Sequence, residues 1–404
     1  MDYPYEVPTN WEWVKLPDVC EYIRAGGDKP QTISEIETSE YKIPVIANGI
    51  QNDGIIGYSN IEDEKAGTIT VSGRGTIGHA VLRNYSYFPV VRLIVLAPNK
   101  SIMPMYMKYI FDSFEEKGIG SSIPQLTIPF LKKKVIPLPP LPEQHRIVAR
   151  IESLFSKLDE AKEKAQSILD GFENRRAAIL HKAFTGELTK KWRDERGIGF
   201  DSWETKNFGE IATVKSNLVD PKDYQDFPHI APDNIEKKTG RLLEYHTIAE
   251  DKVTSGKHRF FAGQILYSKL RPYLSKVIII NFDGLCSSDM YPIEATTNIN
   301  AKYLWYLMLS YNFLQQASMA MSGITLPRIG QKELAMIKMH ITTYPDEQLE
   351  IVRILDRLLS QEQEAKQAAE AVIAQIDVMK KSILARAFRG ELGTNDPSDE
   401  PVRV

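Results

Sequence analysis

The sequence predicts an α+β fold, in which two similar mixed α/β domains are separated by two long helices that form an antiparallel coiled coil. Three observations predict it. The 404 residues are more than one hydrophobic core comfortably serves. A stretch of 46 residues occurs twice, which indicates an internal repeat. Each copy of that stretch has the apolar spacing of a coiled coil. We therefore expect a pseudo-twofold duplication of one unit, a globular part followed by a helix.

The repeat is clearest between residues 143–188 and 347–392, which are identical at 17 of 46 positions without a gap. Upstream, Trp11-Glu12 recurs as Trp203-Glu204, so the globular parts are copies as well, although they have diverged much further. These matches divide the chain into five parts. We expect a first domain over 1–142, a first spacer helix over 143–193, a second domain over 194–346, a second spacer helix over 347–392, and a disordered polar tail over 393–404.

The two repeated segments are predicted to be helices because their apolar residues alternate in steps of three and four. Arg175 and Glu362 are the exceptions to this pattern. Prolines before Glu143 exclude an earlier start, and Gly186 and Gly390 suit the C-terminal ends. The predicted seam comprises Ile147, Ile151, Leu154, Leu158, Ile168 and Phe172 in the first copy, and Ile351, Leu355, Leu358, Val372, Ile376 and Ile383 in the second. Pairing within the chain would place one domain at each end, and the alternative is two unrelated coiled coils that recruit other proteins.

The globular parts mix short strands with turns and one clear helix each. Residues 68–71 and 277–280 are rich in β-branched side chains and predict strands. Residues 105–114 and 302–311 predict helices, and their tyrosines, which share one helix face, are expected to lie in the core.

Residues 73–78 match the glycine pattern of a dinucleotide-binding loop, but the pattern is misleading. A dinucleotide site needs a helix after the last glycine, and the residues that follow predict a strand. We expect instead a loop between two strands that presents polar and charged side chains. The candidate contacts are Ser72, Arg74 and Thr76 here and Lys269, Arg271 and Tyr273 at the comparable place in the second copy. Cations with small hydroxyls suit phosphate and base-edge contacts, and an ordinary solvated loop is the alternative.

A second pair of candidate loops lies at residues 121–125 and 324–328. Gln125 and Arg328 occupy equivalent positions with different chemistry, since glutamine can pair bidentately with adenine and arginine with guanine. Lys257 and Arg259 form a further basic cluster, for which a merely solvated charge run is the alternative.

The composition sets limits on the function. The net charge is −3, with 14 basic and 16 acidic residues in 1–142 and 17 and 18 in 194–346, so any basic surface is local or supplied by a partner. Cys20 and Cys286 are too few and too far apart for a disulfide framework or a zinc site. No signal peptide or membrane-spanning run is apparent, and a reducing cytoplasm is the expected location.

Sequence motifs for catalysis are also missing. Pro139-Pro140 follows Leu138, whereas an amino-methyltransferase motif needs Asn or Asp before the two prolines, and no Walker A loop occurs. We therefore expect a chain that reads and positions DNA without a catalytic centre, cofactor or metal of its own.

The proline-rich stretch 137–144, the Ile147-Val148 after it, and the Ala-Phe-x-Gly-Glu-Leu ends at 183–188 and 387–392 resemble the specificity subunit of type I restriction-modification systems. The resemblance covers nearly the whole chain. The second copy departs from it at 343–348, which lacks the paired prolines, but the helix start and the apolar spacing remain.

The resemblance implies two target-recognition domains that read a bipartite DNA target with a nonspecific gap. It implies two modification subunits and additional restriction subunits as partners, with S-adenosylmethionine, ATP and Mg in those partners. It also implies docking of the modification subunits near the helix ends, which points to Phe184 and Phe388. The alternatives are a coiled-coil scaffold that does not read DNA and a stand-alone DNA enzyme.

Overall fold

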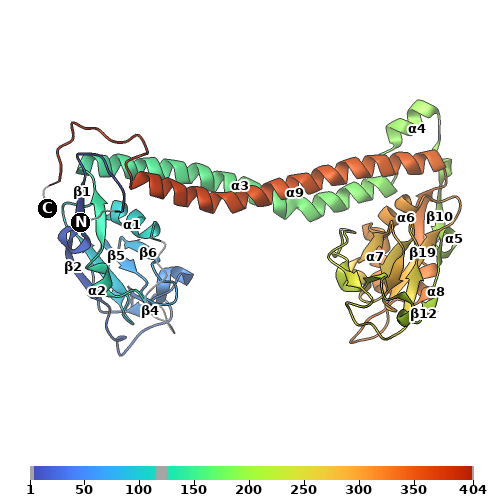
Figure 1. Ribbon diagram of the computed structural model, residues 1–404, viewed down its shortest axis with the longest axis horizontal. Coiled ribbons are helices and arrows are strands. Elements are labelled where there is room, and N and C mark those ends of the chain that lie inside the picture. The colour runs from blue at the N-terminus through green and yellow to red at the C-terminus, as the bar shows by residue number, and fades with distance from the viewer. Residues whose placement is uncertain (1–3, 115–124, 403–404) are drawn as a thin grey trace. The chain divides into compact units, whose positions relative to one another are not determined.

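The computed structural model describes residues 4–114 and 125–402 and divides into two compact units (Figure 1). Unit 1 contains the chain up to Gln166 and from Glu370 onward, and unit 2 contains Ser167–Ala369. Helix α3 (Leu141–Phe184) and helix α9 (Pro345–Ala387) each contribute one half to each unit. The sequence-based division cuts the chain at the helix ends, whereas the units divide within the helices, because each half-helix packs on the domain beside it.

The centre of unit 1 is an antiparallel sheet in the order β2-β8-β5-β6. Helix α1 (Pro104–Asp112) packs on β5 and β6 through its buried face, which carries Tyr106, Met107 and Ile110 (Figure 1). The remaining strands form a small sheet β4-β3-β7, with β3 and β7 parallel, and a two-stranded ladder β1-β9. The bounds are β1 Glu12–Lys15, β2 Cys20–Ala25, β3 Ile43–Ile46, β4 Ile55–Ser59, β5 Thr68–Val71, β6 Ala80–Arg83, β7 Phe88–Pro89, β8 Ile94–Pro98, α2 Ile128–Leu131 and β9 Val135–Leu138.

Unit 2 repeats this plan and extends it. Its central sheet has the order β11-β19-β16-β17 and is again antiparallel, with α6 against β17 and β19. The second sheet, β12-β15-β18-β13-β14, keeps the parallel pair as β13-β18 and adds β12 and β15. The bounds are α4 Lys190–Arg196, β10 Trp203–Asn207, α5 Phe208–Ile211, β11 Ala212–Val214, β12 Leu218–Val219, β13 Pro228–Ile230, β14 His246–Thr247, β15 Lys257–Phe260, β16 Ile265–Ser268, β17 Val277–Ile279, β18 Gly284–Cys286, β19 Met290–Ala295, α6 Ala301–Met308, α7 Tyr311–Met319, α8 Gln331–Ala335 and β20 Lys338–Thr342.

Both long helices begin two residues earlier than predicted. Pro142, one of the prolines expected to exclude an earlier start, lies in the first turn of α3, and Pro345 lies in the first turn of α9. In the first turn a backbone N–H has no partner within the helix, so a proline costs little there. The C-terminal ends predicted at the two glycines are confirmed, since Gly186 and Gly390 follow the helices with φ of +76° and +75°. Only glycine adopts this left-handed conformation without strain. The first spacer helix therefore ends at Phe184 and does not reach the predicted bound of 193.

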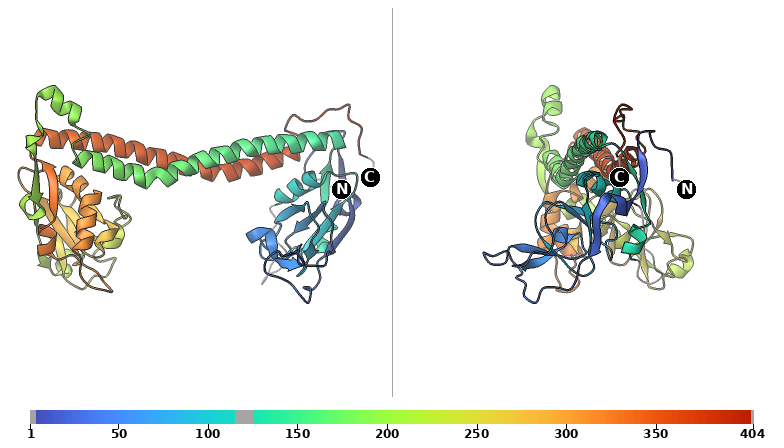
Figure 2. Two further views of the ribbon diagram at one scale, coloured as in Figure 1. Left: turned by 180° about the vertical axis from the view of Figure 1, so that it is seen from behind. Right: turned by 90° about the vertical axis from the view of Figure 1, so that its left-hand side faces the viewer.

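Within each unit the two half-helices lie side by side and run antiparallel (Figures 1 and 2). In unit 1, Lys380 of α9 pairs with Asp159 of α3 at 2.6 Å, and the start of α3 shares a core with the end of α9. In unit 2, Arg175 pairs with Glu362 at 2.8 Å. The two exceptions to the apolar pattern are therefore each other's partners, which explains why charged residues are tolerated in this seam.

The seam itself departs from the predicted one near its centre. Ile168 and Val372 are 39% and 40% exposed, whereas their neighbours Leu169 and Ile373 are half-buried. A strict seven-residue repeat drifts around a straight helix of 3.6 residues per turn, so the buried stripe moves by one residue. The same shift places Leu359, which is 7% exposed, in the seam instead of the predicted Leu358. The other predicted seam residues are buried or half-buried.

The shorter predicted elements agree with the structure. Strand β5 has the predicted bounds, strand β17 ends one residue early at Ile279, and the two predicted helices correspond to α1 and α6. The tail differs from the disorder that we expected for it. Asn395 donates hydrogen bonds to Asn10 and Glu143, and Arg146 forms an ion pair with Asp399. Across residues 4–114 and 125–402, no helix has the length and apolar character needed to cross a membrane.

Candidate nucleic-acid interface

The glycine-rich loop of unit 1 connects strands β5 and β6, as the sequence predicts, and no helix opens at its end. Ser72 lies inside the loop, since its side chain is 2% exposed and its Oγ accepts a 3.4 Å bond from the Gly49 amide. The Gly73 amide donates to Asn48 at 2.8 Å. Ser72 therefore supports the loop rather than presenting a group to a ligand.

Two other predicted contacts of unit 1 come together. The Arg74 guanidinium donates to the Gln125 carbonyl at 3.1 Å. The Leu126 amide donates to the Gly73 carbonyl at 2.9 Å, which ties the segment after Gln125 to the glycine-rich loop. The other residues of the candidate loop that ends at Gln125, residues 121–124, lie outside the described residues.

The same loop encloses polar atoms that no protein group satisfies among the described residues. These are the Thr76 hydroxyl and Nε2 of His79. Burial lowers the pKa of His79, so the ring favours its neutral form. Enclosed polar atoms normally bond to protein, water or a ligand, so Thr76 stays a candidate contact.

Unit 2 joins its two candidate loops in the same way. The Ile329 amide donates to the Lys269 carbonyl at 3.0 Å, which matches the Leu126–Gly73 bond of unit 1. The Arg271 amide donates to the Pro327 carbonyl at 2.8 Å. Arg271 is exposed and Tyr273 is 43% exposed, so both are accessible to a ligand. The loops of each copy thus form one continuous edge.

The side chains on this edge differ from those of unit 1. Arg328 pairs with Asp289 at 3.0 Å, and the ammonium of Lys269 lies 5.1 Å from the centre of the Tyr291 ring. Sequence reasoning missed Asp289, because nothing in its local pattern shows that it faces a cation 39 residues away. Its carboxylate orients the guanidinium of Arg328 without covering it, since both side chains remain partly exposed.

The basic cluster at 257–259 is not a solvated charge run. Lys257 is 7% exposed, its ammonium donates to the Ser255 hydroxyl at 2.7 Å, and burial lowers its pKa. The Arg259 guanidinium lies between 4.7 and 5.9 Å from the rings of Tyr224, Phe227 and Phe261. Lys257 is thus internal, whereas half-buried Arg259 is held in an aromatic setting.

Two buried glutamates, Glu143 and Glu347, lie at matched positions of the repeat and anchor the helices to the domains, a role that was not predicted for them. Glu347 is fully buried and receives hydrogen bonds from Trp203, Thr189 and Thr342 at 2.7 to 3.1 Å, and it pairs with Arg193 at 2.5 Å. The identity of these positions in the repeat is the signal that could have identified them.

In unit 1 the equivalent Glu143 is also fully buried. It receives hydrogen bonds from Trp11 at 2.8 Å and from Asn395 at 2.9 Å, and no ion pair to it is present among the described residues. The tryptophan–glutamate contact is therefore common to both units, whereas an arginine partner occurs in unit 2 alone within the part of the chain that the structure describes.

The two phenylalanines expected to dock a partner face inward instead. Phe388 is 3% exposed and packs edge-on against Tyr106, with ring centres 5.5 Å apart. Half-buried Phe184 packs in the same way against Tyr303, also at 5.5 Å. The Ala-Phe-x-Gly-Glu-Leu ends thus close each domain onto its helix, and their apolar side chains are used within the chain.

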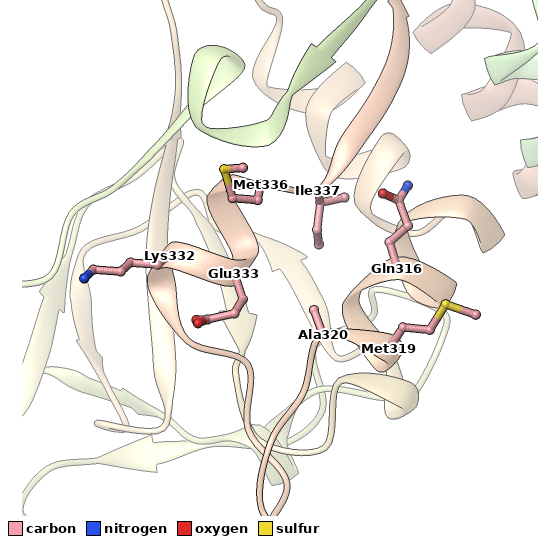
Figure 3. Close-up of a pocket in the computed structure, with 7 residues that line it drawn as sticks. All are labelled: Gln316, Met319, Ala320, Lys332, Glu333, Met336 and Ile337. Atoms are coloured by element: carbon pink, nitrogen blue, oxygen red, sulfur yellow. The ribbon is translucent and has the colours of Figure 1, made fainter.

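A hollow of about 470 Å³ lies between α7 and α8 of unit 2 (Figure 3). Met319 and Met336 flank it and are 74% and 68% exposed. Lys332 and Glu333 are the only charged residues that line it. The other lining residues are apolar or carry an amide, so the hollow has no histidine, cysteine or hydroxyl group among them. Within the described part of the chain, no three His, Cys, Asp or Glu side chains gather as a metal site would require.

Comparison with known proteins identifies the repeated domain. The model of the type I restriction modification DNA specificity domain matches twice, over residues 8–169 and 201–373. The EcoDI specificity subunit of a type I restriction enzyme from Escherichia coli is 36% identical over 307 residues, which cover 71% of this chain and 68% of that protein. The MjaIX specificity subunit from Methanocaldococcus jannaschii is 24% identical over 366 residues, covering 80% of this chain and 81% of that protein.

Solved structures show the same fold. A chain from a type I restriction-modification system, solved in a study of complex assembly and conformational transition, matches with a TM-score of 0.69. It covers 96% of this chain and all of that chain at 17% identity. The HsdS subunit from Thermoanaerobacter tengcongensis matches with a TM-score of 0.65, at 17% identity and over 96% and 99% of the two chains.

Proposed function

Since this chain belongs to the family of type I restriction-modification DNA specificity proteins, we propose that it is the DNA-reading subunit of such a complex. Each of its two domains reads one half of a split target. One observation carries this proposal: both units join two candidate loops by the same backbone hydrogen bond, yet fill those loops with different side chains. A backbone arrangement that is the same in both units, with different side chains on its loops, is suited to reading two different half-sites.

The base contacts follow from the side chains at the joined loops. Arg74 and Gln125 act together in unit 1, and because Gln125 is already bonded to Arg74 its amide is oriented toward one ligand geometry. In unit 2, Lys269 and Arg271 supply positive charge for phosphates, and Arg328, oriented by Asp289, is placed for a guanine. Tyr273 and Arg259 are secondary contacts, whereas Lys257 and Ser72 act by supporting the loops.

The long helices set the gap between the half-sites. Helices α3 and α9 have 44 and 43 residues and pass without interruption from one unit into the other. At about 1.5 Å per residue, each is about 65 Å long. A protein that reads two half-sites converts its own geometry into the spacing of its target, so the helices act as a ruler.

Chemistry and part of the DNA affinity are supplied by other chains. Neither domain has an excess of basic residues, so partner contacts to phosphates complete the interface. We expect two modification subunits, which bring S-adenosylmethionine, and restriction subunits, which bring ATP and Mg. Because Phe184 and Phe388 face inward, these partners dock on the exposed faces of the helices rather than on the phenylalanine rings.

The direct test is co-expression of the chain with a modification subunit, followed by mapping of methylated bases in genomic DNA. The expected result is a stable complex that methylates a split motif with a fixed gap. A complex that methylates nothing, or that methylates a continuous motif, would contradict the proposal. DNA cleavage by the purified chain alone would favour a stand-alone enzyme.

The ruler is tested separately by removing seven residues from the middle of each helix. This change keeps the apolar stripe nearly in register and shortens each helix by about 10 Å. Methylation should move to targets with a shorter gap or be lost. An unchanged gap in the methylated motif would show that the helices do not set the spacing.

A further inference from the structure

We propose that residues 322–328 of unit 2 form a DNA-contacting finger whose tip, Ile324, makes apolar contact with base edges of the second half-site. This inference rests on the proposed function and adds a contact of a different chemical kind, one that neither a cation nor an amide can make. Residues 322–328 are called the finger below.

The finger is held at its base by backbone hydrogen bonds. Ser322 and Arg328 exchange two of them, at 2.8 and 2.9 Å, and so close a short loop. Gly323 has a φ of +97°, a conformation that other residues rarely adopt, and it allows the chain to turn there. The bonds from Arg271 to Pro327 and from Ile329 to Lys269 fasten the base to the neighbouring loop. The finger therefore presents its tip in a defined position.

The tip is apolar and exposed. Ile324 is as accessible as in an extended chain, at 103%, and Leu326 is 46% exposed. Single apolar residues are common on protein surfaces and need no special role. This isoleucine differs in standing at the end of a fastened loop on the edge that carries the candidate DNA contacts. Figure 3 shows the chain between Ala320 and Lys332 running away from the hollow between α7 and α8.

The charges around the finger favour DNA as the ligand. Residues 268–276 and 321–332, which contain the base and the finger, include five cations and no carboxylate. The domain as a whole has 17 basic and 18 acidic residues, so this local excess is a property of the edge. Among the described residues, two carboxylates from outside these segments are ion-paired to them: Asp289 holds Arg328 at 3.0 Å, and Asp233 pairs with Lys276 at 3.2 Å.

Together these features assign different parts of the DNA to different residues of the edge. The cations Lys269, Arg271 and Arg328 hold phosphates or guanine at the base of the finger. Ile324 then reaches the bases, where the methyl group of thymine is the natural apolar partner in the major groove. An isoleucine is suited to this contact because the removal of its apolar surface from water is favourable in free energy. A polar side chain at the tip would need a matching hydrogen-bond donor or acceptor on the base.

The test uses the complex with its modification subunit and a duplex that carries the mapped target. Ile324→Ala should weaken binding about tenfold, since three carbons lose their contact. Ile324→Asp should weaken binding further, because it adds a charge that repels phosphate. Met336→Ala is the matched control, an equally simple loss of an exposed apolar side chain at the far end of α8, and should leave affinity unchanged. Replacing thymine by uracil in the second half-site should weaken binding of the unaltered chain but not of Ile324→Ala.

The outcomes separate the inference from the proposed function. If Ile324→Ala and Ile324→Asp bind and methylate the same split target with unchanged affinity, the finger does not contact DNA although the chain still reads it. If either variant loses the modification subunit while retaining DNA affinity, the tip contacts protein and the inference is wrong. If the unaltered complex recognises no split target, it is the proposed function that fails. Melting temperatures of the variants, expected to be unchanged, show that the fold is intact.

Discussion

The two domains of this chain share a frame and differ in what the frame presents. Their central sheets have the same strand order, and both begin their long helix with a buried glutamate that binds a tryptophan. Their joined loops, by contrast, carry Arg74 and Gln125 in unit 1 and three cations with an apolar finger in unit 2. Buried positions thus hold the architecture, while exposed loop positions are free to change the sequence that is read.

The largest expected effect is a difference in unfolding free energy between alanine variants of the two buried glutamates. Glu347→Ala leaves Arg193, 6% exposed, without its ion-pair partner and should cost about 3–5 kcal/mol of unfolding free energy. Glu143→Ala leaves only uncharged donors unpaired and should cost about 1–3 kcal/mol. Urea unfolding of each variant measures the difference.

Glu347→Gln serves as the control for this pair, because it keeps the shape and some of the hydrogen bonds but removes the charge. It should fall between the other two. Equal losses for Glu347→Ala and Glu143→Ala would mean that the ion pair of unit 2 adds nothing to the tryptophan contact that both units share.

The second effect concerns the phenylalanines that close each domain. Phe388→Ala removes a buried ring from its contact with Tyr106 and should cost about 3 kcal/mol, whereas half-buried Phe184 should cost less on truncation. Thermal unfolding and co-purification with the modification subunit are measured together. If a variant no longer co-purifies with the modification subunit although its melting temperature is unchanged, the phenylalanine does dock the partner, as the sequence suggested.

Much of the fold was predictable from the sequence. The repeat, the helices and the strand at 68–71 follow from patterns that local chemistry imposes, so they were predictable. The exposure of Ile168 and Val372 was not, because a strict heptad pattern and a straight helix diverge by one residue only over several turns.

The site was less predictable than the fold. Ser72 and Lys257 have the right chemistry for DNA contact, but only the tertiary structure shows that they are internal. The pairing of Arg328 with Asp289 spans 39 residues and leaves no local signal. Contacts brought together by folding are thus the part that single-sequence reasoning cannot reach.

A smaller effect tests the shifted seam of the helices. Ile376 is 2% exposed and Val372 is 40% exposed, although the heptad pattern places both in the seam. Ile376→Ala should cost about 2 kcal/mol and Val372→Ala under about 1 kcal/mol. Both lie on α9 in unit 1, so one denaturation series compares them. Similar losses at the two positions would support the strict heptad seam instead.

The smallest expected effect is on the pH dependence of stability. Burial lowers the pKa of His79 in unit 1 and of His258 in unit 2, where Lys269 adds to the shift. The unfolded chain then binds protons more readily than the folded one below about pH 6.5, so stability should fall as the pH drops through that value and be constant above it. Urea midpoints between pH 5.5 and 8 measure this, and His258→Gln should flatten the curve. A stability that rises on acidification in this window would contradict the assignment.

If each domain reads its own half-site through its joined loops, a substitution in one domain should change only that half of the methylated motif. Methylation mapping of Gln125→Ala and Arg328→Ala, each co-expressed with the modification subunit, tests it most directly. Gln125→Ala should relax the first half of the motif alone and Arg328→Ala the second half alone, with the gap unchanged. Relaxation of both halves by either substitution, or of neither half by both, would contradict it.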